Sequence, residues 1–114
     1  MKLIVCGGRN YRNIHAVRHV LTAVHAKRPI TLLIEGGAKG ADRLAREWAV
    51  ATGVPVATEE ADWDKYGKRA GPIRNGLMLS KHMPDGIIAF PGGFGTDDMI
   101  AQALKAGVKV YEPF

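Results

Sequence analysis

The sequence is poor in cysteine and lacks long apolar runs. Its one cysteine, Cys6, has no partner for an internal disulfide, and no cysteine and histidine spacing typical of a zinc site occurs. Because Cys6 closes an apolar run, a small buried side chain is favoured over a nucleophile. No apolar stretch reaches the roughly 18 residues that span a bilayer, and the run at 3–6 is far shorter than the apolar part of a secretory signal. We therefore expect a cytoplasmic protein without a membrane span.

Two common nucleotide-binding signatures are also absent. The segment 6–11, Cys-Gly-Gly-Arg-Asn-Tyr, contains no G-x-G-x-x-G, and the Lys-Ser/Thr of a P-loop follows neither 36–40 nor 91–96. The sequence therefore supports neither a dinucleotide dehydrogenase nor a P-loop NTPase. His15 and His19 are four residues apart on an expected helix, but without a third ligand they are interpreted as surface residues.

Length and composition indicate an ordinary globular protein. The chain has 114 residues, of which 46% are hydrophobic and 24% are charged, and we expect a single domain over 1–114. The net charge of +5 favours anionic partners but does not separate a nucleotide from a nucleic acid. The basic residues are scattered, and the one short basic patch with an aromatic residue, 65–69, is interpreted as a solvated loop.

Apolar runs alternate with helical periodicity along the chain. Strands are expected at 3–6, 30–35, 54–58, 86–90 and 108–111. Pro55 places the third strand at a sheet edge or makes it a strand start, because proline lacks a ladder N–H. Helices are expected between the strands, with these inward side chains and ends: Ile14, Val17, Leu21 and Val24 in the first; Ala41, Leu44, Ala45, Trp48 and Ala49 in the second, ended by Gly53; Ile73, Leu77 and Met78 in the third, opened by Gly71-Pro72; and the fourth over 97–106, ended by Gly107.

Strands separated by helical crossovers predict a parallel sheet with helices on both faces. The expected fold class is therefore α/β, a small doubly wound parallel sheet of about five strands. In such sheets ligands bind beyond the carboxyl ends of the strands, near the point where the strand order reverses. Residues 59–68 are the least regular part, and Trp63 and Tyr66 in it either stack on a bound base or pin the loop to the core.

Three glycine-rich turns follow three of the expected strands. Gly7-Gly8 follows the first strand, Gly36-Gly37 follows the second, and Pro91-Gly-Gly-Phe-Gly-Thr96 follows the fourth. Glycine lets a backbone lie close to a bound group, and a helix N-terminus offers unpaired N–H groups to oxygen atoms. Thr96 is expected to cap the helix after it. The sequence predicts that backbone amides of Gly36, Gly37, Gly92, Gly93 and Gly95 form an anion-binding cradle.

Basic side chains near these turns are candidate anion ligands. Arg74 leads, because it lies two residues after Pro72 in the first turn of a helix, and a guanidinium suits a phosphate in bidentate fashion. Arg9, just beyond the first strand, and Lys39 are further candidates. For both of these a surface ion pair is the alternative role.

Acidic side chains at the last turn are candidate sugar ligands. Asp97 and Asp98 follow Thr96, where a carboxylate interacts favourably with the helix dipole but repels a phosphate. The phosphate is therefore expected nearer Arg74 and the Gly36 turn, with Asp98 facing ribose hydroxyls. Asp42 is interpreted as an i,i+4 partner of Arg46, with a site role as the alternative.

Four segments in order resemble the SLOG superfamily of Rossmann-like domains, and within it the small YspA-type branch. They are Gly7-Gly-Arg-Asn-Tyr11, Glu35-Gly-Gly-Ala-Lys-Gly-Ala-Asp42, Trp63 with Gly71-Pro-Ile-Arg-Asn75, and Pro91-Gly-Gly-Phe-Gly-Thr96. The resemblance covers essentially the whole chain and implies a domain that binds nucleotides or nucleotide-derived small molecules. It also implies a homodimer.

The same superfamily includes LOG-type phosphoribohydrolases, which split a base from a nucleoside monophosphate. Those enzymes carry an Arg-Lys pair early in a helix and the motif PGGxGTxxE. Arg74 and 91–96 match, but Asn75 stands in place of the lysine and Met99 in place of the glutamate, with Asp98 the nearest acid. These departures favour binding over this type of catalysis.

The resulting hypothesis is a sensing or sequestering domain for a nucleotide-derived ligand, which needs no metal or cofactor. The first alternative is an N-glycosidic hydrolase in which Arg74 and Asp98 are catalytic and Asp98 stabilises a cationic sugar or activates water. The second alternative is single-stranded DNA binding, as in some SLOG relatives, which the absence of a basic, aromatic-rich strand face disfavours. The expected ligand-binding residues are Gly7, Gly8, Arg9, Gly36, Gly37, Lys39, Arg74, Asn75, Pro91, Gly92, Gly93, Gly95, Thr96 and Asp98.

Overall fold

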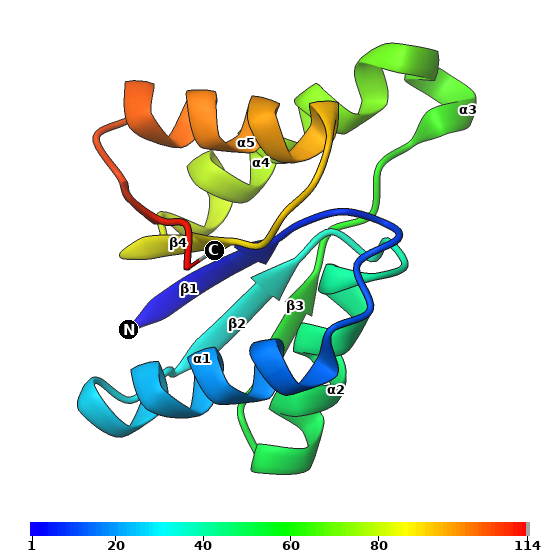
Figure 1. The fold of residues 1–114 in the computed structure, drawn as a ribbon. Helices are drawn as coiled ribbons and strands as arrows, with labels where there is room; N and C mark the ends of the chain where they lie inside the picture. The colour runs from blue at the N-terminus through cyan, green and yellow to red at the C-terminus, as the bar shows by residue number, and fades with distance from the viewer. Residues whose placement is uncertain (114) are drawn as a thin grey trace.

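The computed structural model describes residues 1–113 and has a parallel sheet at its centre with helices on both faces (Figure 1). Within these residues the sheet has five strands in the order β3-β2-β1-β4-β5. The α/β class, the parallel sheet and the two helical layers predicted from the sequence are confirmed. The elements are β1 (Lys2–Cys6), α1 (Ile14–Lys27), β2 (Leu32–Glu35), α2 (Ala41–Thr52), β3 (Val56–Thr58), α3 (Trp63–Tyr66), η1 (Gly67–Arg69), α4 (Ala70–His82), β4 (Gly86–Ala89), α5 (Phe94–Lys105) and β5 (Lys109–Tyr111).

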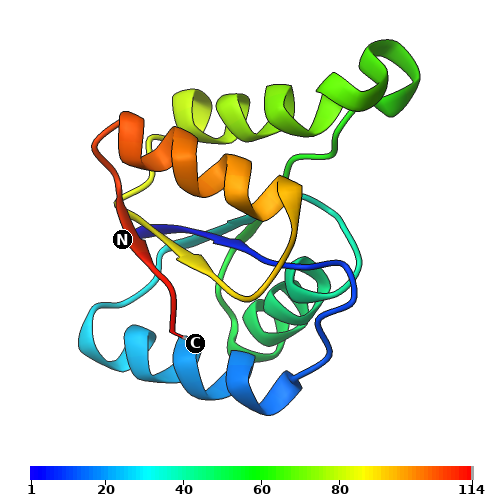
Figure 2. The same ribbon diagram turned by 45° about the horizontal axis from the view of Figure 1, so that its top comes forward.

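Side chains of β1 alternate between two cores, because successive residues of a strand point to opposite faces. Leu3 and Val5 pack in the core beneath α1 and α2, whereas Ile4 and Cys6 pack in the core beneath α4 and α5. Figure 2 shows these two helical layers on either side of the sheet. The central strand therefore has both faces covered, as its nearly continuous apolar sequence indicates.

The edges of the sheet agree with the sequence patterns. β3 pairs only with β2 among the described strands, so the strand that follows Pro55 lies at an edge as predicted. β5 forms the opposite edge and pairs with β4. No helix in the part of the chain that the structure describes is long and apolar enough to cross a bilayer.

Helix α5 begins earlier than predicted, at Phe94 rather than at Asp97. Its N-cap is Gly93, which has no side chain to accept a hydrogen bond, so the predicted capping role of Thr96 is wrong. Thr96 instead lies in the first helical turn, where it is buried against Gly92. Gly92 leaves room for Thr96 to pack inward, because a Cβ at Gly92 would overlap the Thr96 side chain.

The prediction that Leu77 faces the core is also wrong, because 54% of its surface is exposed. The buried residues of α4 are Ala70, Gly71, Asn75 and Met78, with spacings of one, four and three. One residue corresponds to about 100° of helix rotation, so Leu77 lies to the side of Met78 and faces outward.

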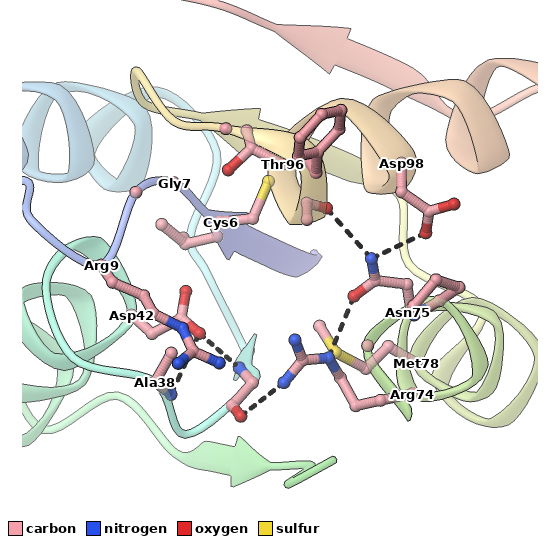
Figure 3. A pocket seen from close by; sticks show the side chains of 18 of the residues that line it. Cys6, Gly7, Arg9, Ala38, Asp42, Arg74, Asn75, Met78, Thr96 and Asp98 are labelled. Atoms are coloured by element: carbon pink, nitrogen blue, oxygen red, sulfur yellow. Dashed lines mark hydrogen bonds between the residues drawn. The ribbon is translucent and has the colours of Figure 1, made fainter. Parts of the chain in front are cut away.

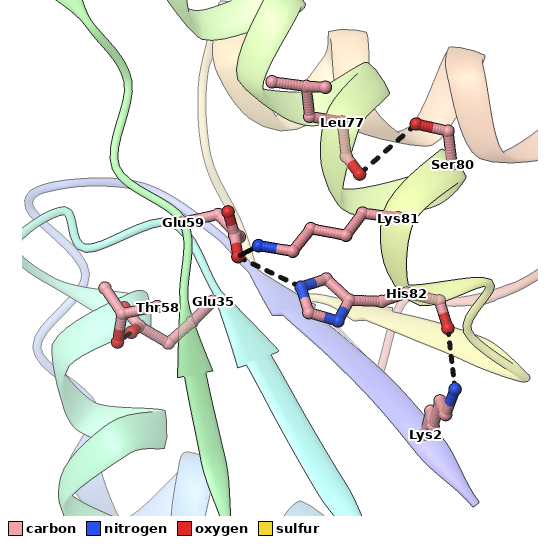
Figure 4. Close-up of polar contacts among 8 residues, drawn as sticks. All are labelled: Lys2, Glu35, Thr58, Glu59, Leu77, Ser80, Lys81 and His82. Carbon is pink, nitrogen blue, oxygen red and sulfur yellow. Dashed lines mark hydrogen bonds and ion pairs between the residues drawn. The ribbon is translucent and has the colours of Figure 1, made fainter.

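Residues 59–68 are more regular than the predicted loop. They contain the single turn α3 and most of η1, and Trp63 and Tyr66 in them are exposed. The start of this segment is fixed to α4, because the Glu59 carboxylate accepts a hydrogen bond from Lys81 Nζ at 2.8 Å and lies 3.2 Å from His82 Nε2 (Figure 4). The segment that carries Trp63 therefore leaves the sheet from a defined position.

Candidate functional site

The strand order reverses between β1 and β4. The chain runs from β1 outward through β2 to β3, then crosses to β4 on the other side of β1 and continues to β5. Ligands of doubly wound sheets bind at such a point, beyond the carboxyl ends of the strands. A cavity of about 430 Å³ opens there (Figure 3).

Most of the predicted binding residues surround this cavity. Its lining includes Gly7, Gly8, Arg9, Gly36, Arg74, Asn75, Gly93, Gly95, Thr96 and Asp98. Gly37 and Lys39 line a second, adjoining cavity, while the described residues Pro91 and Gly92 lie outside both linings. Pro91 contacts the turn after β1, because its carbonyl accepts a hydrogen bond from Gly8 N at 2.9 Å. Gly92 lies against the same turn, since a Cβ on it would be 2.7 Å from Gly8 N.

Asn75 connects the basic and acidic walls of the cavity. Its Oδ1 accepts from Arg74 Nε at 3.0 Å, and its Nδ2 donates to Asp98 Oδ2 at 2.9 Å and to the Gly95 carbonyl at 3.1 Å. Asp98 Oδ2 accepts a second bond from Gln102 Nε2 at 2.7 Å. Because Asn75 is only 3% exposed, these bonds fix α4 against the start of α5 (Figure 3).

Arg74 reaches from α4 to the turn after β2. Its Nη1 donates to the Gly36 carbonyl at 2.7 Å, and Nε is used by Asn75. Nη2 has no acceptor in the part of the chain that the structure describes, and the side chain lines the cavity. Arg74 is therefore positioned by two bonds and keeps one terminal nitrogen for a ligand.

The amides of Gly36 and Gly37 do not form the predicted anion cradle, because protein carboxylates already accept from them. Gly36 N donates to Asp42 Oδ2 at 3.2 Å, and Gly37 N donates to Glu35 Oε1 at 2.7 Å. Ala38 N also donates to Asp42 Oδ2, at 3.3 Å. An anion at this turn would have to displace a buried carboxylate.

Asp42 is therefore not the surface partner of Arg46 that the spacing suggested. It is 5% exposed and holds the turn after β2 from within. Burial raises the pKa of Asp42 from 3.8 to about 6, against the lowering effects of the Ala38 and Gly36 amides and the Arg74 charge.

This raised pKa predicts how stability depends on pH. Between pH 4 and 6 the folded protein holds the Asp42 proton more tightly than the unfolded chain does. The contribution of Asp42 to the free energy of unfolding is therefore full below about pH 4 and is lost as the pH rises through 6. A difference of roughly two pKa units corresponds to about 3 kcal/mol. The free energy of unfolding of the native protein minus that of Asp42→Asn should fall by about 2–3 kcal/mol between pH 4 and 7, measured by urea unfolding.

Glu59→Gln provides a control of opposite sign. The hydrogen bond from Lys81 and the neighbouring His82 lower the pKa of Glu59, so its contribution is present at neutral pH and is lost as the pH falls. The free energy of unfolding of the native protein minus that of Glu59→Gln should therefore rise with pH. A pH-independent difference for Asp42→Asn would contradict the buried, proton-binding role.

The first turn of α5 borders the cavity. Phe94, Gly95 and Thr96 lie at the start of this helix, where N–H groups have no intrahelical acceptor. All three residues line the cavity, and no acceptor for their amides occurs among residues 1–113. A helix N-terminus of this kind attracts anions.

Three cations line the same cavity: Arg9, Lys68 and Arg74. None of them has a carboxylate within 4.0 Å among residues 1–113. The sequence analysis did not select Lys68, because the run 65–69 that contains it was interpreted as a solvated loop. Cys6 also lines the cavity, but burial raises the pKa of its thiol to about 12, so the thiol is neutral near pH 7.

Two aromatic rings border the cavity. Trp63 is 46% exposed, and the Arg9 guanidinium lies 5.3 Å from the centroid of its ring. Phe94 is 96% exposed and was not selected from the sequence, where it is one residue inside a glycine-rich motif. Exposed rings at a cavity offer flat apolar faces to a planar ligand.

Comparisons with known proteins agree with this architecture. A family model described as the YspA, cpYpsA-related SLOG family matches residues 1–66. The Gene 61 protein of Mycobacterium phage D29 is 33% identical over 117 residues, which cover 96% of this chain and 93% of that protein. DNA processing protein A (DprA) from Streptococcus pneumoniae is similar in fold, with a TM-score of 0.56 and 16% identity. The similarity covers 96% of this chain and 58% of the DprA chain, so the present chain spans little more than half of that protein.

Proposed function

Because the chain belongs to the YspA, cpYpsA-related SLOG family, we propose that it binds a nucleotide or nucleotide-derived small molecule at the carboxyl edge of the sheet. In this proposal residues 1–114 act as one sensing or sequestering domain, and the homodimer implied by the sequence resemblance belongs to the same proposal. The observation that carries it is one cavity bordered by exposed aromatic rings, by cations without an ion-pair partner among residues 1–113, and by helix amides without an acceptor among the same residues. These are the groups that recognise a phosphate and a base.

The phosphate is best placed at the first turn of α5. The amides of Phe94, Gly95 and Thr96 are available there, whereas those of Gly36 and Gly37 are already hydrogen-bonded. Arg74 Nη2 faces the same cavity and adds a charge-assisted donor. The proposed phosphate position thus keeps Arg74, as the sequence analysis expected, but replaces the Gly36 turn with the first turn of α5.

The sugar and base fit the remaining walls. Asp98 uses Oδ2 for Asn75 and Gln102, which leaves Oδ1 able to accept from a ribose hydroxyl. Trp63 and Phe94 offer ring faces for stacking on a base. Phosphate, sugar and base would then each meet a group of matching chemistry.

Two observations favour binding over hydrolysis of the N-glycosidic bond. Met99, at the position of the LOG-type glutamate, is 1% exposed and packs in the core beneath α4 and α5. Asn75, at the position of the LOG-type lysine, is neutral and uses its amide to hold Arg74 and Asp98. Neither position supplies the charge that the LOG-type arrangement has there.

A thermal-shift screen with a parallel assay for released base tests the proposal. The ligands are nucleoside monophosphates, ADP-ribose, NAD and short single-stranded DNA, the last because the fold neighbour is a DNA processing protein. A ligand at 100 times its Kd adds about 2.7 kcal/mol of stability, which raises Tm by on the order of 10 °C for a domain of this size. We expect such a shift with a nucleotide that stays intact. Free base would establish the hydrolase alternative, a shift with DNA alone would establish the DNA alternative, and no shift with any ligand would refute the proposal.

A further inference from the structure

Acidic residues are unevenly distributed along the chain. Residues 1–34 contain six of the 16 lysines and arginines and none of the 11 aspartates and glutamates, so this stretch has a formal charge of +6. The remaining residues contain ten basic and eleven acidic side chains and therefore carry −1. The net charge of +5 thus originates in the first 34 residues, which contain β1, α1 and most of β2.

Much of this charge lies on the solvent side of α1, which covers the face of the sheet opposite α4 and α5 (Figure 1). The basic face of α1 is defined by five exposed side chains, Arg12, His15, Arg18, His19 and Lys27. Its two arginines and its lysine have no carboxylate within 4.0 Å among residues 1–113. The helix itself contains no acidic residue. The charge of the basic face is therefore not neutralised by the described part of the chain, which favours an anionic partner.

A hollow of about 420 Å³ lies on the basic face. It is lined by α1 alone, through Arg18, His19, Thr22, Ala23 and Ala26. The two alanines have small side chains, so a partner can approach the helix closely between the longer basic ones. Thr22 Oγ1 accepts a hydrogen bond from Trp48 Nε1 at 3.1 Å, which leaves the hydroxyl hydrogen of Thr22 to donate to a partner. The hollow therefore presents hydrogen-bond donors around a surface without bulky groups.

The basic face lacks the apolar anchors that a protein partner needs. The large exposed hydrophobic residues of the described chain all lie outside α1, whereas protein interfaces are centred on buried aromatic and aliphatic side chains. The helix also contains no Phe, Tyr or Trp, so it lacks the rings on which the bases of a single strand commonly stack. Interfaces with duplex nucleic acid are polar and strongly positive, and most of their hydrogen bonds go to the backbone. The composition of the basic face matches this last class.

We propose that the basic face of α1 binds the sugar-phosphate backbone of double-stranded nucleic acid without reading its sequence. Arg12, Arg18 and Lys27 supply the charge for phosphate contacts, and the histidine rings and the Thr22 hydroxyl supply further donors. This surface is separate from the nucleotide site, because no residue of the basic face lines either cavity at the carboxyl edge of the sheet. The inference therefore does not depend on the proposed function.

Fluorescence anisotropy with a labelled DNA duplex of arbitrary sequence tests this inference. Three phosphate contacts predict that log K falls with log salt concentration with a slope of about −3, which is a loss of roughly 40-fold between 50 and 200 mM salt. The double variant Arg12→Ala/Arg18→Ala should reduce this slope to about −1 and weaken binding at 50 mM salt by at least about 10-fold. Its Tm should stay native, because both side chains are exposed and have no ion pair among residues 1–113.

Two matched comparisons separate the position of the charge from its total. Arg69→Ala/Lys105→Ala removes the same charge from exposed residues of η1 and α5, and it should change duplex binding by less than about 3-fold. Ala23→Glu places a carboxylate at the hollow and should weaken binding by at least about 5-fold. Ala23→Gln has the same shape without the charge and should change binding by less than about 2-fold.

Equal weakening by the two double variants would overturn the inference, because binding would then follow net charge alone. Loss of duplex binding in Arg74→Ala would also overturn it, by placing the duplex at the cavity. If phosphatidylserine vesicles or poly-glutamate bound the basic face as tightly as the duplex does, the face would belong to a membrane or to an acidic protein instead. Absence of duplex binding at 50 mM salt would refute the inference and leave the proposed nucleotide site in place.

Discussion

Arg74→Ala should weaken nucleotide binding by on the order of 100-fold, because hydrogen bonds that involve a charged group contribute about 1.5–3 kcal/mol each. Arg74 lines both cavities, and its Nη2 is its unused donor among residues 1–113. The loss would appear as a higher Kd in calorimetry and as loss of the ligand-induced shift in Tm. The unliganded protein should also lose about 1.5–3 kcal/mol of stability, because the variant removes the charge-assisted hydrogen bonds of Arg74 to the Gly36 carbonyl and to Asn75 Oδ1.

Two further variants separate the position of Arg74 from its charge. In Gly36→Ala the new Cβ would lie 2.8 Å from Arg74 Cζ, so the guanidinium must move while the charge stays. We expect this variant to lose at least 10-fold in affinity. Arg18→Ala removes the same charge from the exposed surface of α1 and should bind as the native protein does. If Arg74→Ala bound with native affinity, the phosphate could not lie where we propose.

The sequence predicted the alternation of strands and helices well, because apolar periodicity is a short-range pattern. Apolar runs located β1, β2 and β4, and their order placed three glycine-rich turns at one edge of the sheet. The start of α5 was missed, since Gly92, Gly93 and Gly95 indicate a turn locally. In the folded chain Thr96 packs against Gly92, and α5 already begins at Phe94. No local sequence pattern indicates this contact.

Most residues that the sequence analysis selected line one cavity, but the sequence did not predict the hydrogen bonds among them. Arg74 and Asp98 lie on the cavity as expected from the ends of their helices. The donors at Gly36 and Gly37 were wrongly assigned, because the carboxylates of Asp42 and Glu35 return to them in the folded turn. Asp42 lies six residues after Gly36 in the sequence. Its i,i+4 spacing to Arg46 suggested a surface ion pair instead of a bond to the Gly36 amide.

Two cavity residues were missed for a related reason. Lys68 lies in the irregular segment after β3, and whether such a residue faces a cavity depends on where that segment is anchored. The contacts of Glu59 with Lys81 and His82 anchor this segment, and each contact joins residues more than twenty positions apart in the sequence. Phe94 lay inside a recognised motif, but only the early helix start directs it to the cavity. Long-range contacts thus set the details that local patterns leave open.

Gly40→Ala should cause a large loss of stability, about 3–5 kcal/mol, from two effects that add. Gly40 has φ of +76° and ψ of −128°, a conformation that costs a residue with a side chain on the order of 1–3 kcal/mol. Its Cβ would also meet the backbone of the turn after β1, lying 2.6 Å from both Arg9 C and Arg9 O and in contact with Gly8 O. Because backbone cannot rotate away, this overlap adds about 1–3 kcal/mol.

Gly53→Ala isolates the first effect, the conformational strain. Gly53 also has positive φ, +83°, but a Cβ there would meet nothing within 4 Å among the described residues, so only conformational strain of about 1–2 kcal/mol is expected. Urea unfolding of both variants measures the difference, and equal losses would show that the close approach at Gly40 contributes nothing.

The contact of Gly40 with the turn after β1 also connects stability to the site. Ala41 N donates to the Gly8 carbonyl at 3.2 Å, so the same approach of two turns holds Arg9 at the junction of the cavities. Gly40→Ala should therefore weaken ligand binding even under conditions in which the variant remains folded, whereas Gly53→Ala should not.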